Sequence, residues 1–112
     1  MNTQLLQKSY EYYVIVSALV EHFPKKDRHA LGIRIENATL CLIEEILRAE
    51  QAPDVLRDHI LLEASVKNAM IKLLVRIAQE KKLIAATNYF RLSGMSEEMG
   101  KMIGGWRKSL RS

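Results

Sequence analysis

The residues of this sequence best suited to chemistry are cations, and their spacing indicates phosphate binding. Lys72 and Arg76 are four residues apart, so on a helix they lie one turn apart on the same face. A second group follows the first predicted helix and comprises Lys25, Lys26 and Arg28. Lysine and arginine contact nucleic-acid phosphates, which gives strong salt dependence and weak sequence preference. These residues are therefore candidate nucleic-acid contacts.

A structural interpretation of the same cations stays open. Arg76 could pair with Glu44 or Glu45 on a facing helix, and charged turns are usually only solvated. Against this interpretation, we expect no acidic neighbour on their own helix to neutralise Lys72 and Arg76. The cations near the C-terminus suit the negative end of a helix dipole and need no further role; they are Arg107, Lys108 and Arg111.

Catalytic and metal-binding arrangements are not indicated. None of the histidines, His22, His29 and His59, lies three or four residues from another, so no helical metal pair is formed. The single cysteine, Cys41, lies in an apolar run, where we expect a buried and unreactive thiol. It cannot form an internal disulfide, which favours a reducing compartment. We expect neither enzymatic activity nor a cofactor nor a metal ion.

Helical periodicity covers almost the whole chain and indicates how these residues are positioned. It predicts helices over residues 3–23, 25–50, 53–83 and 86–110. Amphipathic helices joined by short turns pack against their neighbours in opposite directions. The fold class we predict is all-α: an antiparallel, up-down-up-down four-helix bundle, forming a single domain over residues 1–112.

The apolar spacing also predicts which residues form the core. In the first helix the predicted core face is Leu6, Tyr10, Tyr13, Ser17 and Val20. In the fourth helix it is Tyr89, Leu92, Ser96, Met99, Ile103, Trp106 and Leu110. That spacing continues through Gly94, although glycine costs about 1 kcal/mol in a helix interior. We expect this glycine to mark a close approach of two backbones.

The second and third helices carry more apolar surface than one core needs. The second helix has a core face, Leu31, Ile35, Ala38, Leu42, Ile46 and Ala49, and a nearly opposite row, Ile33, Leu40 and Leu47. The third has two apolar stripes beside the polar line that contains Lys72 and Arg76; one stripe is Leu62, Val66, Ala69, Met70, Leu73 and Ile77. A second apolar face must be covered by another surface, so we expect subunit contacts.

Composition agrees with a folded domain of this size. The chain has 112 residues, 48% hydrophobic, with two prolines and five glycines, which excludes a disordered chain. A net charge of +4 favours a polyanionic partner. We find no secretory signal, and the longest apolar run is far shorter than the roughly 20 residues of a membrane span. We therefore expect a cytoplasmic protein with no membrane partner.

Three segments carry a family resemblance. FPKKDRHALGIRIENATLCLIEEILRAE (residues 23–50), IKLLVRIAQEKKLI (residues 71–84) and MGKMIGGWRKSL (residues 99–110) resemble the accessory variability determinant (Avd) proteins of diversity-generating retroelements. The apolar-Gly-Gly-Trp-basic pattern of the last segment is the most specific. The small four-helix proteins encoded by intervening sequences in bacterial ribosomal RNA genes share the fold and are the nearest alternative.

The resemblance implies a function that the spacing alone does not. Avd proteins are four-helix bundles that assemble as homopentamers and bind nucleic acid through a basic surface. They associate with a reverse transcriptase and a structured RNA to support mutagenic cDNA synthesis. Carried over position by position, their basic residues fall on Lys72, Arg76, Lys25 and Lys26, and the Gly104-Gly105 pair and Trp106 are structural. The alternative is a purely structural bundle with no dedicated nucleic-acid ligand.

Overall fold

The structure, a computed structural model, describes residues 3–111, with the backbone alone for Thr3. Its long helices are α1 (Thr3–Val20), α3 (Ile33–Gln51), α4 (Asp54–Glu80) and α5 (Ala86–Ser109). A short helix α2 (Lys25–Asp27) and a π-helical turn η1 (Arg28–Gly32) lead directly into α3. The prediction of an all-helical fold with four long helices is confirmed, and no strand occurs within residues 3–111.

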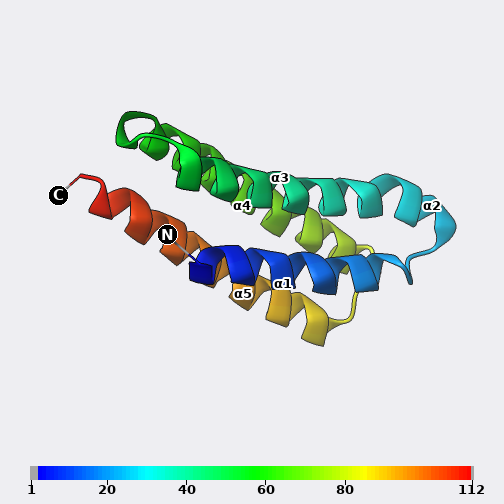
Figure 1. Ribbon diagram of the computed structural model, residues 1–112. Helices are drawn as coiled ribbons and strands as arrows, with labels where there is room; N and C mark the ends of the chain where they lie inside the picture. Colours follow the sequence, from blue (N-terminus) through cyan, green and yellow to red (C-terminus); the bar gives the residue numbers. More distant parts are fainter. Residues whose placement is uncertain (1–2, 112) are drawn as a thin grey trace.

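The long helices run alternately in opposite directions along an elongated body of 46 × 23 × 19 Å (Figure 1). Helix α3 packs against α1 and α4, and α5 packs against α4 and α1. The α1/α5 side of the molecule therefore lies opposite the α3/α4 side. The connection between α1 and α2 and the connection between α4 and α5 lie at one end, which we call the turn end (Figure 1).

Prolines and one arginine define the helix boundaries. Pro24 and Pro53 occupy the N-cap positions of α2 and α4, where a missing N–H leaves no hydrogen bond unmade. Arg57 Nε donates to the Ala49 carbonyl oxygen at 2.8 Å, which satisfies a free carbonyl near the end of α3. The sequence had placed Pro53 one position later in the helix, within the usual uncertainty of helix ends.

Core predictions were accurate for α3 and α5 and mostly wrong for α1, where Val20 is the one predicted residue that is buried. The α3 residues Ile35, Leu42, Ile46 and Ala49 are buried, as are the α5 residues Leu92, Ser96, Met99 and Ile103. In α1 the buried face is instead Leu5, Ser9, Tyr12, Val16 and Val20. Leu6, Tyr10 and Tyr13 are apolar and lie directly beside this face. The same three- and four-residue spacing therefore also fitted a face shifted by one position along the chain.

Glycine in α5 does not mark a close backbone approach, which corrects the prediction. A Cβ atom added at Gly94 would meet no atom within 4 Å, and the same holds at Gly104 and Gly105. The close approach occurs at Gly32, at the end of the π-helical turn, where a Cβ would lie 2.7 Å from Val20 Cγ1. A glycine at residue 32 therefore lets the start of α3 pack against the end of α1.

A small polar group lies within the core. Asn68 Nδ2 donates to the Ser96 carbonyl oxygen at 3.0 Å and so ties α4 to α5. The Tyr12 hydroxyl is buried near the Ser96 side chain, although no hydrogen bond of full geometry joins them among the described residues. Burial raises the pKa of Tyr12 to about 12, and Ser96 offsets part of that rise.

Candidate nucleic-acid interface

The candidate cations at the turn end are accessible. Lys25 and Lys26 form the first turn after Pro24, and both side chains are exposed. Within residues 3–111 neither makes an ion pair, so their charge is available to an external anion. Arg28 differs because it is half-buried, with its Nε atom enclosed and without a hydrogen-bond partner among the described residues. Arg28 is therefore the least accessible member of the group.

The turn end also contains two cations that the sequence interpretation missed. Lys81 Nζ lies 3.2 Å from Asp27 Oδ1, so the end of α4 is tied to α2 by an ion pair. Lys82 has φ 62°, a left-handed conformation that usually requires glycine, and the Leu83 N–H donates to the Ala78 carbonyl oxygen at 2.9 Å. The adjacent lysines were visible in the sequence, but only the fold places them at the same end as Lys25 and Lys26.

Lys72 pairs with an acidic residue of another helix. Its Nζ atom lies 2.6 Å from Glu97 Oε1 of α5, and both side chains are partly exposed, at 43% and 61%. The hydrogen bond from Lys72, with the nearby Lys72 charge, holds the pKa of Glu97 below its ordinary value. The Lys72 charge is therefore largely compensated within the chain.

Arg76 pairs within its own helix, which corrects the expectation that it has no acidic neighbour there. Its Nε atom lies 3.4 Å from Glu80 Oε2, one turn further along α4. The proposed partners Glu44 and Glu45 instead contact Arg48 on α3, at 2.8 and 3.6 Å. This i,i+4 relation between Arg76 and Glu80 is already present in the sequence.

The five predicted contacts therefore do not form one site. Lys25, Lys26 and Arg28 lie together at the turn end, and Lys82 follows Lys81, which pairs with Asp27 of α2. Arg76 lies one turn from Glu80, where α4 ends, and Lys72 lies a further turn away along α4. Only Lys25 and Lys26 of the five are both exposed and without an ion pair among the described residues.

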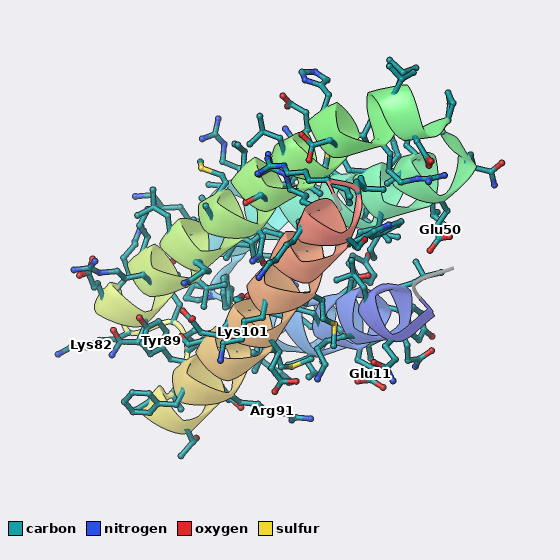
Figure 2. The ribbon with its side chains drawn as sticks, turned by 90° about the vertical axis from the view of Figure 1, so that its left-hand side faces the viewer. Glu11, Glu50, Lys82, Tyr89, Arg91 and Lys101 are labelled. Carbon is teal, nitrogen blue, oxygen red and sulfur yellow. The ribbon has the colours of Figure 1, made fainter. Side chains whose placement is uncertain are left out.

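Helix α5 supplies further cations that were assigned no role. Its two acidic residues are paired by other helices: Glu97 by Lys72, and Glu98 by Lys8 at 2.8 Å. Arg107 Nε binds Asp58 Oδ1 at 3.0 Å and holds the pKa of that carboxyl group below its ordinary value. In contrast, no ion pair within residues 3–111 involves Arg91, Lys101 or Lys108. Figure 2 shows Lys82, Tyr89, Arg91 and Lys101 along this part of the molecule.

The α3/α4 side carries the second apolar faces predicted from the sequence. Nine large apolar side chains of these two helices are 42–85% exposed: Ile33, Leu40 and Leu47 of α3, and Val55, Leu56, Leu62, Val66, Met70 and Leu73 of α4. A shallow groove of about 340 Å³ on this side is lined by Arg34, Asn37, Ala38, Met70 and Leu74. An exposed apolar face of this extent is typical of a protein interface.

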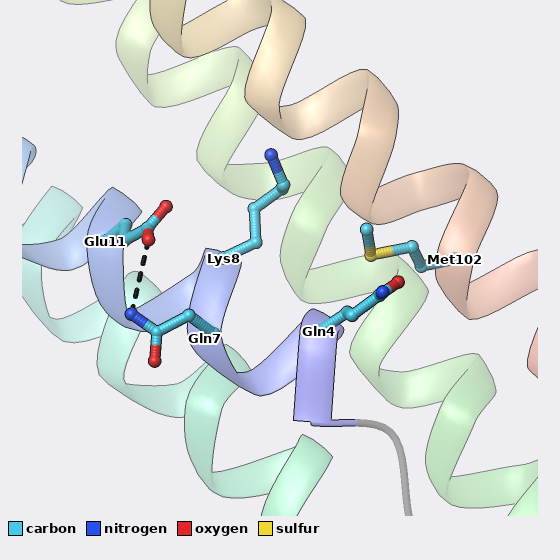
Figure 3. Close-up of a pocket in the computed structure, with 5 residues that line it drawn as sticks. All are labelled: Gln4, Gln7, Lys8, Glu11 and Met102. Carbon is cyan, nitrogen blue, oxygen red and sulfur yellow. Dashed lines mark hydrogen bonds between the residues drawn. The ribbon is translucent and has the colours of Figure 1, made fainter.

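Grooves on the opposite, α1/α5 side are more polar. The groove in Figure 3 has a volume of about 490 Å³ and is lined by Gln4, Gln7, Lys8, Glu11 and Met102. Gln7 Nε2 donates to Glu11 Oε1 at 3.2 Å across its wall. A neighbouring groove of about 400 Å³ includes Tyr10, Val14 and Arg91. Both grooves are open to solvent rather than enclosed.

Cys41 is exposed on α3, which corrects the expectation of a buried thiol. Its neighbour Leu40 is also exposed, whereas Leu42 is buried. Part of the apolar run around Cys41 therefore lies on the outer surface of α3. Within the described residues no cluster of three or more His, Cys, Asp or Glu side chains could hold a metal ion. None of the described helices is long and apolar enough to cross a membrane.

Comparison with known families agrees with this arrangement of helices. A family model described as bAvd-like matches residues 3–110, which is almost the whole chain. The chain belongs to the bAvd-like family. A search of curated proteins found no match. The family match covers all four long helices, including the turn end and both sides of the bundle.

Proposed function

We propose that this protein is a non-catalytic accessory subunit of a diversity-generating retroelement, which binds RNA and the reverse transcriptase during mutagenic cDNA synthesis. The observation that carries the proposal is the bAvd-like match over residues 3–110, because it spans every helix. The structure adds exposed cations without ion pairs among the described residues, at the turn end and along α5. Such residues suit contacts with phosphates.

The proposed subunit acts as a homopentameric ring. Support comes from the exposed apolar face on the α3/α4 side, whose nine large side chains a single bundle leaves uncovered. A head-to-tail contact between copies forms a closed ring when the rotation that relates neighbouring copies is a whole-number fraction of 360°. Five copies, each with a net charge of +4, would together carry about +20, which favours multivalent binding of a polyanion. Cytoplasmic residence is part of the same proposal, since its RNA and enzyme partners are intracellular.

Among the predicted contacts, the structure favours Lys25 and Lys26 as the main RNA contacts. Lys72 and Arg76 must leave Glu97 and Glu80 before they can bind phosphate, so we assign them secondary roles. Arg28 contributes positive charge from a half-buried position. This ranking reverses the order expected from the sequence, and it follows from the ion pairs alone.

The test is the binding of structured RNA at about 50 and 200 mM salt, a range over which phosphate contacts weaken strongly. We compare the native protein with Lys25→Glu/Lys26→Glu and with Lys72→Glu/Arg76→Glu. The first pair should weaken binding more and reduce the slope of log affinity against log salt by roughly one for each lysine. Oligomeric mass and circular dichroism of each variant serve as controls. Failure of the native protein to bind RNA at low salt would refute the proposal.

The alternative is a structural bundle with no nucleic-acid ligand, and one observation favours it. Both cations of the α4 polar line are paired within the chain, Lys72 at 2.6 Å and Arg76 at 3.4 Å, as expected of residues that serve folding. Under this alternative, charge reversal at Lys72 and Arg76 changes stability. The native protein does not bind RNA, so no variant can weaken that binding. Co-expression and co-purification with the reverse transcriptase of a diversity-generating retroelement would separate the two functions independently.

A further inference from the structure

The outward face of α5 exposes an aromatic ring beside a glycine. Phe90 is 69% exposed, more than any other aromatic side chain among the large hydrophobic residues exposed in the described chain. It lies two residues before the buried Leu92, a rotation of about 200°, so it points away from the core. Gly94 lies one turn further along the same face, and the space where its side chain would be is open. One side of the ring is therefore free of intramolecular neighbours along the helix.

Packing within the chain gives no reason for this glycine. Apart from proline, glycine is the least favourable residue in a helix interior, yet α5 carries it at residues 94, 104 and 105 with nothing within 4 Å of the missing Cβ. Tyr89 contacts the Phe90 ring at a centroid distance of 5.7 Å and an interplanar angle of 57°. This tilted contact orients the ring and leaves its outward side accessible.

The charges around Phe90 are cationic. Arg91 is the next residue, and Lys82 lies in the turn between α4 and α5, shortly before α5 begins at Ala86 (Figure 2). Further along α5, Lys101 lies about 16 Å from Phe90, given a helical rise of 1.5 Å per residue. The helix's acidic residues Glu97 and Glu98 are already paired with lysines of α4 and α1. The net charge that α5 offers to an external ligand is therefore positive.

We propose that the outward face of α5 binds single-stranded nucleic acid, with an unpaired base stacked on Phe90 and phosphates near Arg91 and Lys101. This inference rests on the proposed RNA-binding function and specifies its ligand as unpaired nucleotides. Proteins that bind single strands combine aromatic side chains, on which bases stack, with cations that follow the backbone. The open backbone at Gly94 gives the stacked base and its sugar room beside the ring.

A protein partner is the competing occupant of this face, and the composition of α5 argues against it. Among the described residues, Phe90 is the single large apolar side chain that is exposed on α5, whereas α3 and α4 have nine. The fully buried centre of a protein interface is depleted in charge and rich in apolar groups. An isolated ring among cations and glycines fits a base and its phosphates better than it fits such a centre.

The experiment compares a single-stranded oligouridylate roughly 12 nucleotides long, within the site sizes of single-strand binders, with an RNA duplex of equal length. The native protein should bind the single strand, and Phe90→Leu should weaken that binding by about 5- to 100-fold, which corresponds to one lost stacking contact. Duplex binding, which uses phosphates alone, should stay within about twofold. Phe90→Trp should restore the single-strand affinity, because indole also stacks.

The matched control is Tyr13→Leu, which removes a ring of α1 that does not line the groove of Arg91 and should leave both affinities unchanged. Equal single-strand binding by Phe90→Leu and the native protein would overturn the inference while leaving RNA binding through phosphates intact. A changed oligomeric mass in Phe90→Leu would also overturn it, because it would place a protein on the ring. If the native protein binds neither RNA, the inference and the proposed function both fail.

Discussion

Lys72 Nζ lies 2.6 Å from Glu97 Oε1 and so joins the middle of α4 to the middle of α5. The pair links residues 25 positions apart in the chain, and no local sequence pattern indicates it. Glu97 also lies near Lys101, which lowers its pKa further. The relationship changes the interpretation of the α4 cations, because a lysine that already holds a carboxylate is a weaker ligand for phosphate.

Replacing Glu97 with glutamine tests this pair through its pH dependence. The pKa of Glu97 is lowered in the folded protein, so its stabilising effect is present above the ordinary value of 4.5 and is lost as pH falls through the folded value. We expect the free energy of unfolding of the native protein to decline as pH falls below about 5, and Glu97→Gln to reduce that decline. Urea denaturation across this range provides the measurement.

The matched control for this variant is Glu63→Gln, because Glu63 is exposed on α4 and makes no ion pair among the described residues. It should leave the pH dependence of unfolding unchanged. If Glu97→Gln and Glu63→Gln have the same profile as the native protein, the Lys72–Glu97 pair makes no contribution in solution. Freed from its partner, Lys72 should also raise RNA affinity slightly in Glu97→Gln at low salt.

Much of the fold followed from the sequence because helical periodicity is strong over long segments. The fourth helix was predicted to within a residue or two at each end despite its glycines, since the core spacing around Leu92, Ser96, Met99 and Ile103 was unbroken. The face of α1 was missed by one position because tyrosines extended its apolar surface sideways. A partly apolar flank makes two helical registers nearly equivalent until the neighbouring helices are placed.

The candidate site was predicted less well, for two different reasons. Glu80 was visible four residues after Arg76, so that ion pair required only a complete count of neighbours. The pairing of Lys72 with Glu97, and that of Lys81 with Asp27, depend on which helices are adjacent in space. Charge compensation between helices is therefore the property that sequence spacing predicts least well.

Leu40→Glu should prevent assembly of the proposed ring. Leu40 is 44% exposed on the α3/α4 side, so the substitution adds a charge to the apolar face without entering the core. We expect the helical content to be unchanged and the mass in light scattering or analytical ultracentrifugation to fall to that of a monomer. A native protein that is already monomeric would exclude the ring, and an unchanged oligomer in Leu40→Glu would place its interface elsewhere.

Cys41 provides an independent measure of the same assembly. It is the single cysteine of the chain and is exposed on α3, next to Leu40. If the α3/α4 side is covered in the ring, a thiol reagent should modify Cys41 more slowly in the native oligomer than in Leu40→Glu. Equal rates in an oligomer of confirmed mass would show that α3 remains uncovered. Labelling under denaturing conditions gives the intrinsic reactivity for comparison.

Tyr12 should make the protein sensitive to alkali. Its pKa is raised from 10.0 to about 12 by burial, so its stabilising effect is complete below pH 10 and is lost as pH rises toward 12. This rise in the pKa of Tyr12 corresponds to a loss of about 2.7 kcal/mol in the free energy of unfolding once pH exceeds 12. Tyr12→Phe should lose that pH dependence, with its stability near pH 7 changed by about 1 kcal/mol or less. Tyr10→Phe, which alters an exposed ring, should behave like the native protein.

Two glycine-to-alanine substitutions should have opposite effects on stability. Gly32→Ala places a Cβ atom 2.7 Å from Val20 Cγ1, and valine has few side-chain rotamers through which to move aside, so we expect a loss of about 1–3 kcal/mol. Gly94→Ala meets no neighbouring atom and replaces a poor helix former, so we expect a gain of about 0.5–1 kcal/mol. Thermal and urea denaturation of both variants provide the measurement.

A stabilised Gly32→Ala would mean that α1 and the start of α3 are not in contact in solution. A destabilised Gly94→Ala would mean that a subunit or another part of the chain covers residue 94, which would also remove the space required for a stacked base.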